Sequence, residues 1–114
     1  MPYLMVQTNI PLGKKAERAI LKNASALVSE LLEKPESFVM VALQADTPML
    51  FAGSDDPVAF LELKAIGLSA RRTKDLCEAL CQLIEGHLGI ARDRVYVKFI
   101  DVKGAMWGWK GDTF

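Results

Sequence analysis

The residue with the most distinctive chemical potential is Pro2, which directly follows the initiator Met1. Cells commonly remove Met1 when a small residue follows it, which leaves Pro2 with a free secondary amine at the N-terminus. The apolar residues 3–8 behind it predict a buried strand. An amine in an apolar site has its charged form disfavoured, and a nearby cation lowers its pKa further. Pro2 is therefore a candidate general base that works near neutral pH.

The other reactive side chains form no standard catalytic set. His87 is the only histidine, and its place near the end of a predicted helix favours a solvated imidazole. Cys77 and Cys81 are spaced as on one helix face, and no His or Cys follows them at metal-ligand spacing. The sequence has neither a Walker A loop nor a GxGxxG motif. We therefore predict no metal ion and no cofactor.

Length and charge narrow the class of protein further. The 114 residues fit a single domain that spans residues 1–114. Fourteen Lys and Arg balance fourteen Asp and Glu, which argues against a nucleic-acid partner. No apolar run approaches the ~20 residues needed to cross a bilayer, and the N-terminus lacks the charged region of a signal peptide. We expect a cytoplasmic protein without a membrane partner, and release without a signal peptide stays open.

Two halves of the chain repeat the order strand, helix, strand. The first half has these elements at residues 3–8, 14–34 and 38–45. The second half has them at residues 60–66, 71–88 and 95–102, and a short last strand is expected at 106–109. Pro35 and Gly89 are the expected helix stops, because proline disfavours a helical residue before it and glycine suits a helix C-terminus.

These elements predict an α+β fold in which two β-α-β units form a four-stranded mixed sheet. Right-handed crossovers make the two strands within each unit parallel and place both helices on one face of the sheet. The other face is expected to be apolar and bare. Hydrophobic residues make up 51% of the chain and the mean hydropathy is +0.17. A bare apolar face predicts that several copies associate.

Over essentially its whole length the sequence resembles the family of macrophage migration inhibitory factor and D-dopachrome tautomerase. The match has one compensating insertion and deletion in the middle. Its segments occur in the family's order: Pro2, Thr8-Asn9-Ile10-Pro11, Lys34-Pro35, Phe51-Ala52-Gly53-Ser54, Ile66-Gly67, Asp93-Arg94-Val95-Tyr96, Asp101, Gly108-Trp109 and Thr113-Phe114. Each segment alone is weak, whereas their order and spacing together are specific.

The resemblance implies a homotrimer with three sheets around a central channel and the helices outside. It also implies keto–enol tautomerisation of phenylpyruvate-like α-keto acids and of dopachrome. The neutral amine of Pro2 would take a proton from the carbon beside the carbonyl and return it at the other end. Lys34 would hold the substrate carboxylate or carbonyl and help to depress the pKa of that amine.

The same resemblance implies the other binding residues. Ile66 would contribute a backbone N–H and an apolar wall, and Tyr96 would come from the neighbouring subunit. Phe38, Trp109 and Phe114 would complete the apolar lining.

Four departures from the family pattern bear on specificity and partners. Lys98 stands where the family has an asparagine, and Trp107 replaces a small aliphatic residue. We expect Lys98 to add positive charge and Trp107 to narrow the pocket, so that small or more anionic keto acids are favoured. Pro57 is followed by Val58 rather than by a Cys-x-x-Cys motif, so thiol–disulfide activity is not expected. Leu12 replaces an arginine, which argues against binding to a cytokine receptor.

A second function class stays open, namely a cytokine-like signalling or interaction protein with a vestigial pocket. The joint presence of Pro2, Lys34, Ile66 and Tyr96 favours the enzyme. Binding to a receptor has no evident need for a terminal proline amine.

Overall fold

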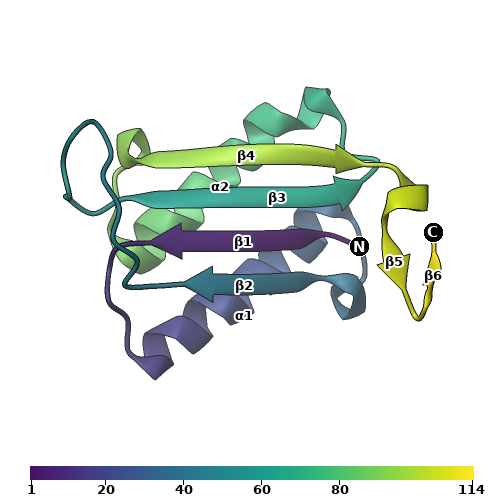
Figure 1. Ribbon diagram of the computed structural model, residues 1–114, viewed down its shortest axis with the longest axis horizontal. Coiled ribbons are helices and arrows are strands. Elements are labelled where there is room, and N and C mark those ends of the chain that lie inside the picture. Colours follow the sequence, from purple (N-terminus) through teal and green to yellow (C-terminus); the bar gives the residue numbers. More distant parts are fainter.

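A computed structural model describes all residues 1–114, and its main elements are a sheet, two long helices and a C-terminal hairpin (Figure 1). The strands and helices are β1 (Tyr3–Thr8), α1 (Lys14–Leu32), β2 (Met40–Gln44), β3 (Ala59–Ile66), α2 (Thr73–Leu88), β4 (Val95–Val102), β5 (Gly108–Trp109) and β6 (Asp112–Thr113). Short 3-10 turns occupy Glu36–Phe38, Ala70–Arg72, Arg92–Arg94 and Gly104–Met106. Neither long helix has a stretch that is both long and apolar enough to cross a membrane.

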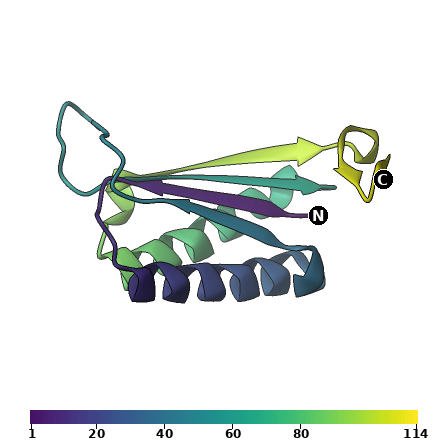
Figure 2. The ribbon, with the colours of Figure 1, turned by 60° about the horizontal axis from the view of Figure 1, so that its bottom comes forward.

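The four long strands form one mixed sheet in the order β2-β1-β3-β4. β1 is parallel to β2 and β3 is parallel to β4, whereas β1 and β3 are antiparallel. Both helices cover the same face of the sheet (Figure 2). The predicted α+β arrangement of two β-α-β units is therefore confirmed.

The hydrophobic core lies between the sheet and the two helices. Alternate residues of β1 and β3 point into it, because successive side chains of a strand face opposite sides. The helices contribute residues at helical spacing, and the largest buried side chains are Leu4, Ile20, Leu61, Leu63, Leu76, Leu80, Ile84 and Ile90. This core fixes which side chains are left to face away from the helices.

Several predicted boundaries were wrong, each for a local reason. Phe38 does not begin a strand, because its N–H donates to the Pro35 carbonyl at 3.0 Å and closes a 3-10 turn before β2. The first helix ends at Leu32, two residues early, because Glu33 adopts a left-handed conformation with φ 53°. The second helix begins at Thr73 after a 3-10 turn and ends at Leu88, and Gly89 follows it as the predicted stop, with φ 67°. The last strand is one arm of the β5–β6 hairpin rather than residues 106–109.

The sheet face away from the helices is uncovered by this chain, as predicted, but it is not purely apolar (Figure 2). Polar side chains alternate onto it and pair with one another. Gln7 Nε2 donates to Gln44 Oε1 at 2.9 Å, and Lys64 Nζ lies 3.0 Å from Glu62 Oε1. The prediction of a wholly apolar face was wrong. It treated the strands as continuous apolar runs, and the few polar residues in them were not assigned to one face of the sheet or the other.

Arg94 fixes the long loop between β2 and β3. Its guanidinium donates to four backbone carbonyls of that loop, those of Phe51, Ser54, Asp56 and Pro57, at 2.7–3.2 Å. It also lies 5.2 Å from the centroid of the Phe51 ring, whose own centroid is 4.6 Å from that of Tyr96. Arg94 thus ties the loop to the start of β4, next to Tyr96.

We predict that Arg94→Ala lowers the free energy of unfolding by about 2 kcal/mol, because partly buried carbonyls lose a charged donor. Urea unfolding at a fixed protein concentration measures this change.

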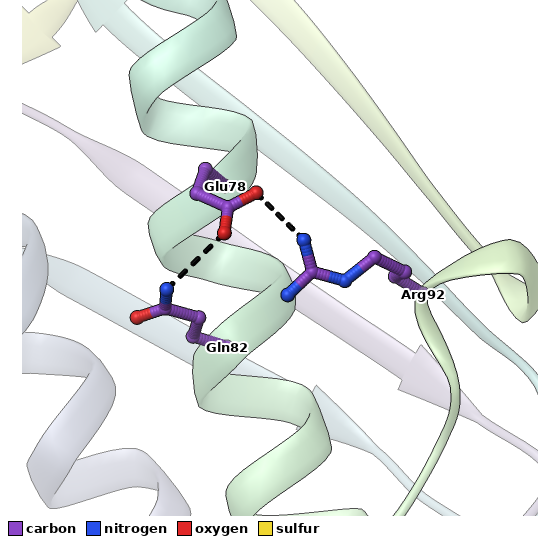
Figure 3. A network of polar contacts seen from close by, with 3 residues as sticks. All are labelled: Glu78, Gln82 and Arg92. Carbon is purple, nitrogen blue, oxygen red and sulfur yellow. Dashed lines mark hydrogen bonds and ion pairs between the residues drawn. The ribbon is translucent and has the colours of Figure 1, made fainter.

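Arg92→Ala is the matched control. Arg92 donates to the exposed Glu78, which also accepts from Gln82 (Figure 3), and the pKa of Glu78 is lowered mainly by the Arg92 hydrogen bond. That exposed ion pair should matter far less, since exposed ion pairs stabilise little. Equal losses in the two variants would contradict the role given to Arg94.

Candidate active site

A cavity of about 630 Å³ opens at the end of the sheet where β1 begins. The N-terminus, residues 37–40, the ends of β3 and β4, and the C-terminal hairpin surround it, and Figure 1 shows the N-terminus beside β5. Ten of its fourteen lining residues are hydrophobic, and the lining is Met1, Pro2, Tyr3, Ser37, Phe38, Val39, Met40, Lys64, Val102, Met106, Trp107, Gly108, Trp109 and Phe114. Its size and apolar walls are typical of small-molecule sites.

Pro2 lies at the inner wall of this cavity and is buried. Its carbonyl accepts a hydrogen bond from the Met40 N–H at 3.0 Å, which anchors the chain where β1 and β2 begin. Met1 stands in front of Pro2 and also lines the cavity. Burial, and to a smaller extent the Lys34 ammonium, lowers the pKa of the N-terminal amine on Met1 below its ordinary value. An amine at this end of β1 is thus biased towards its neutral form.

The chain turn after α1 sets the position of Lys34. The Lys34 N–H donates to the Ser29 carbonyl at 3.1 Å, and the Ser29 hydroxyl donates to the Lys34 carbonyl at 2.5 Å. Lys34 is half-buried and does not line the cavity. Its charge nevertheless acts on the N-terminal amine, so it lies at the edge of the site.

Aromatic side chains form part of the wall of this cavity. The rings of Phe38 and Trp109 meet edge to face with centroids 5.2 Å apart, and Phe114 stacks on Trp109 at 5.9 Å. Trp107 lines the same cavity. Gly104 allows the C-terminal residue to approach, because a Cβ there would lie 3.0 Å from the Phe114 carbonyl oxygen. Of the five aromatic residues expected in the pocket, four line this cavity, namely Phe38, Trp107, Trp109 and Phe114.

Three further expected residues do not line the cavity of a single chain. Ile66 ends β3 two residues beyond the Lys64–Tyr3 pair, so it lies at the same end of the sheet as Pro2. Tyr96 is exposed and level with Gln7 in the strand register, five residues from Pro2, or about 16 Å along the sheet. Lys98 is level with Met5 and faces Glu62.

Part of the lining was not predicted from the sequence, above all Tyr3, Met40, Lys64 and Val102. Three of them lie at the same level of the sheet, since Tyr3 pairs with Met40 on one side and with Lys64 on the other. The alternation of side chains along each strand predicts that all four residues lie on the sheet face away from the helices. Without the register between strands, this alternation does not predict that they lie near Pro2.

The remaining reactive groups lie away from the cavity. Burial, followed by the neighbouring Cys77, raises the pKa of the Cys81 thiol, so this thiol is a poor nucleophile. His87 Nε2 lies 3.0 Å from Asn23 Nδ2, between the two helices. No group of three or more His, Cys, Asp and Glu side chains comes together to form a metal site.

The fold and the site define a class, namely small proteins of two β-α-β units whose N-terminus lies against an apolar pocket. A family model described as macrophage migration inhibitory factor (MIF) matches residues 1–114. The chain belongs to the macrophage migration inhibitory factor family.

Relatives and solved structures agree with this assignment. The Brugia malayi macrophage migration inhibitory factor homolog is 36% identical over 115 residues, which cover 100% of this chain and 99% of that protein. The Mus musculus macrophage migration inhibitory factor is 32% identical with the same coverage. The crystal structure of the Prochlorococcus marinus homologue superposes with a TM-score of 0.92 at 41% identity, covering 98% of each chain. The Trichinella spiralis structure gives a TM-score of 0.92 at 34% identity, covering 98% of this chain and 99% of that one.

Proposed function

We propose that this protein is a keto–enol tautomerase that acts on phenylpyruvate-like α-keto acids and on dopachrome-type compounds. The observation that carries the proposal is the buried Pro2 against an apolar cavity, at an N-terminus whose amine has a lowered pKa. The proposal also draws on the family's resemblance in Pro2, Lys34, Ile66 and Tyr96.

In the proposed mechanism Met1 is removed and Pro2 becomes the N-terminal amine. The neutral nitrogen takes a proton from the carbon beside the substrate carbonyl, and the C–H electron pair becomes the C=C bond of the enol. The carbonyl oxygen receives the proton, so the substrate is isomerised without gain or loss of atoms. The reverse transfer returns the keto form, with Pro2 as the general acid and base.

The other residues bind and orient the substrate. Lys34 holds the carboxylate or carbonyl at the edge of the cavity, and Ile66 supplies a backbone N–H and an apolar wall. The rings of Phe38, Trp107, Trp109 and Phe114 pack against the apolar part of the substrate. We include Tyr96 as a contribution of the neighbouring subunit, since it does not line the cavity of its own chain. Lys98 adds positive charge near the site.

The proposed assembly is a homotrimer in which neighbouring subunits cover the open sheet face. This face carries exposed apolar side chains beside its polar ones, including Met40 and Tyr96, which are 66% and 63% exposed in one chain. Such a surface favours an interface between copies of the same chain. Each cavity would then be completed by residues of a second subunit.

A second candidate is a cytokine-like signalling or interaction protein that keeps a vestigial pocket. It would apply if Met1 stayed attached in the mature protein, because Pro2 is then an amide and cannot act as a base. Leu12, half-buried where the family has an arginine, argues against receptor binding. Mass spectrometry of the purified protein separates the two candidates by showing whether Met1 is present.

A test of the enzymatic proposal is the enol-to-keto conversion of phenylpyruvate by the Met1-processed protein and by its Lys34→Met variant. Burial and, to a smaller extent, Lys34 lower the pKa of the Met1 amine. We expect Lys34 to act in the same direction on the Pro2 amine of the processed protein, so the loss of Lys34 should raise the pKa of that amine. Activity needs the neutral amine and therefore increases with pH through this pKa. The rising limb of the pH profile of kcat/KM should move to higher pH, and kcat/KM at pH 7 should fall about tenfold.

The control for this experiment is Lys22→Met, which removes the same charge from an exposed position on α1. This variant should keep the wild-type pH profile. An unmoved rising limb in Lys34→Met would contradict the electrostatic role of Lys34, and absence of turnover by the processed wild type would contradict the tautomerase.

A further inference from the structure

Lys64 is the only charged side chain that lines the cavity. It lies on β3 directly opposite Tyr3 of β1. In the strand register Lys64 is therefore one residue away from the position opposite Pro2. Directly opposed residues of antiparallel strands have Cβ atoms about 5 Å apart. Lys64 therefore lines the same cavity as Pro2, one residue further along the sheet, on an otherwise largely apolar wall.

The hydrogen-bonding capacity of Lys64 is only partly used. Its Nζ lies 3.0 Å from Glu62 Oε1 and 5.6 Å from the centroid of the Tyr3 ring. An ammonium has three N–H donors, and the Glu62 contact uses one of them. The Lys64 side chain is 37% exposed and that of Glu62 is 19% exposed, so the cation is the more accessible member of the pair.

The charges around Lys64 leave an excess of positive charge. Glu62 faces Lys98 in the strand register and lies two residues from Lys64 on the same strand. One carboxylate thus stands between two ammonium groups, so the three side chains carry a formal charge of +1. This row favours an anion more than a cation at the cavity side of Lys64.

Lys34 and Lys64 flank Pro2 on opposite sides. The chain runs from Lys34 into β2 on one side of β1, whereas Lys64 lies on β3 on the other side. In the proposed mechanism the substrate carboxylate is bound by Lys34 and the reacting carbon lies at Pro2. The rest of the substrate then lies in the apolar cavity. A second anionic group on that part would find Lys64 as the charged partner in the lining.

We propose that Lys64 forms a second anion subsite, so that the preferred substrates are aromatic α-keto acids carrying a second anionic group. This inference rests on the proposed tautomerase function, with Lys34 holding the first carboxylate. The sequence attributed the expected preference for more anionic substrates to Lys98, and the structure offers a different residue for it. Lys64 of the same chain supplies the cation, and Lys98 acts through Glu62.

The experiment compares phenylpyruvate with 4-carboxyphenylpyruvate as substrates of the Met1-processed protein. The wild type should show a higher kcat/KM for the carboxylated substrate. Lys64→Met should lower the ratio of kcat/KM for the carboxylated substrate to that for phenylpyruvate about tenfold, mainly through a higher KM for the carboxylated substrate, as expected for the loss of one charge-assisted hydrogen bond. Lys22→Met is the control for the loss of a positive charge elsewhere and should change neither KM.

Glu62→Gln keeps the inference testable if Lys64→Met fails to fold. This variant frees Lys64 from its ion pair, so the preference for the carboxylated substrate should increase about threefold. Equal effects of Lys64→Met on both substrates, or an unchanged preference in Glu62→Gln, would overturn the anion subsite while leaving the tautomerase intact. No turnover of either substrate by the wild type would instead overturn the proposed function itself.

Discussion

Replacement of Pro2 by glycine is expected to lower kcat/KM for phenylpyruvate tautomerisation about 100-fold, within the range that general acid–base catalysis contributes. Glycine leaves an N-terminal amine, but it removes the ring that fixes φ and restricts the direction of the nitrogen. The Met40 N–H anchors only the carbonyl of residue 2, so a glycine nitrogen can rotate away from the cavity. Initial rates of enol-to-keto conversion, with mass spectrometry of each preparation, measure the effect.

A second variant separates the chemistry of the nitrogen from its position. An alanine inserted between Met1 and Pro2 leaves the proline in place but converts its nitrogen into an amide, which cannot accept a proton. This protein should lose at least as much activity as Pro2→Gly while keeping its fold by circular dichroism. If the insertion variant or Pro2→Gly retained the wild-type rate, Pro2 would not be the catalytic base.

Much of the fold could be predicted because local patterns agree with the final packing. Strands 3–8 and 95–102 were located correctly, since apolar runs there end at clear turn signals. Gly89 was identified as a helix stop because only glycine adopts its left-handed conformation at little cost. Phe38 could not be placed in this way. The 3-10 turn after Pro35 depends on one backbone hydrogen bond, which hydrophobic periodicity does not reveal.

The candidate site was harder to predict than the fold because it is assembled from both ends of the chain. Pro2 was predicted from its own chemistry, whereas its place in one cavity with Trp109 and Phe114 was expected only from the family resemblance. Lys64 was missed because its position next to Pro2 follows from the antiparallel register of β1 and β3. Side-chain alternation assigns Lys64 to a face, whereas only the register assigns it to a level along the sheet.

The separation of Pro2 and Tyr96 within one chain gives the proposed trimer a direct consequence. About 16 Å of sheet lies between their levels, and Tyr96 is packed against Phe51 at the far end, beside the loop that Arg94 holds. One chain therefore does not bring both residues to one substrate. If both serve the same reaction, each site must take Pro2 from one subunit and Tyr96 from another.

Mixing two defective variants is expected to restore activity that neither variant has alone. Pro2→Gly and Tyr96→Ala, combined in equal amounts, unfolded and refolded together, should form trimers of random composition. A site that takes Pro2 from one chain and Tyr96 from another is then intact in about one quarter of cases, because each choice is correct half of the time. We expect recovery to about 25% of the wild-type rate, against about 5% for the same proteins refolded separately and then mixed, if Tyr96→Ala alone costs about tenfold.

The control for refolding is the wild type taken through the same treatment, which should regain its full rate. The mixing result discriminates sharply because every chain in the mixture carries one of the two defects. A site built from a single chain can never be intact, so a rate that remains at the separately refolded value would contradict the shared site. Recovery near one quarter would require that Pro2 and Tyr96 act across an interface, and the uncovered sheet face of each chain would then be a functional contact as well as a structural one.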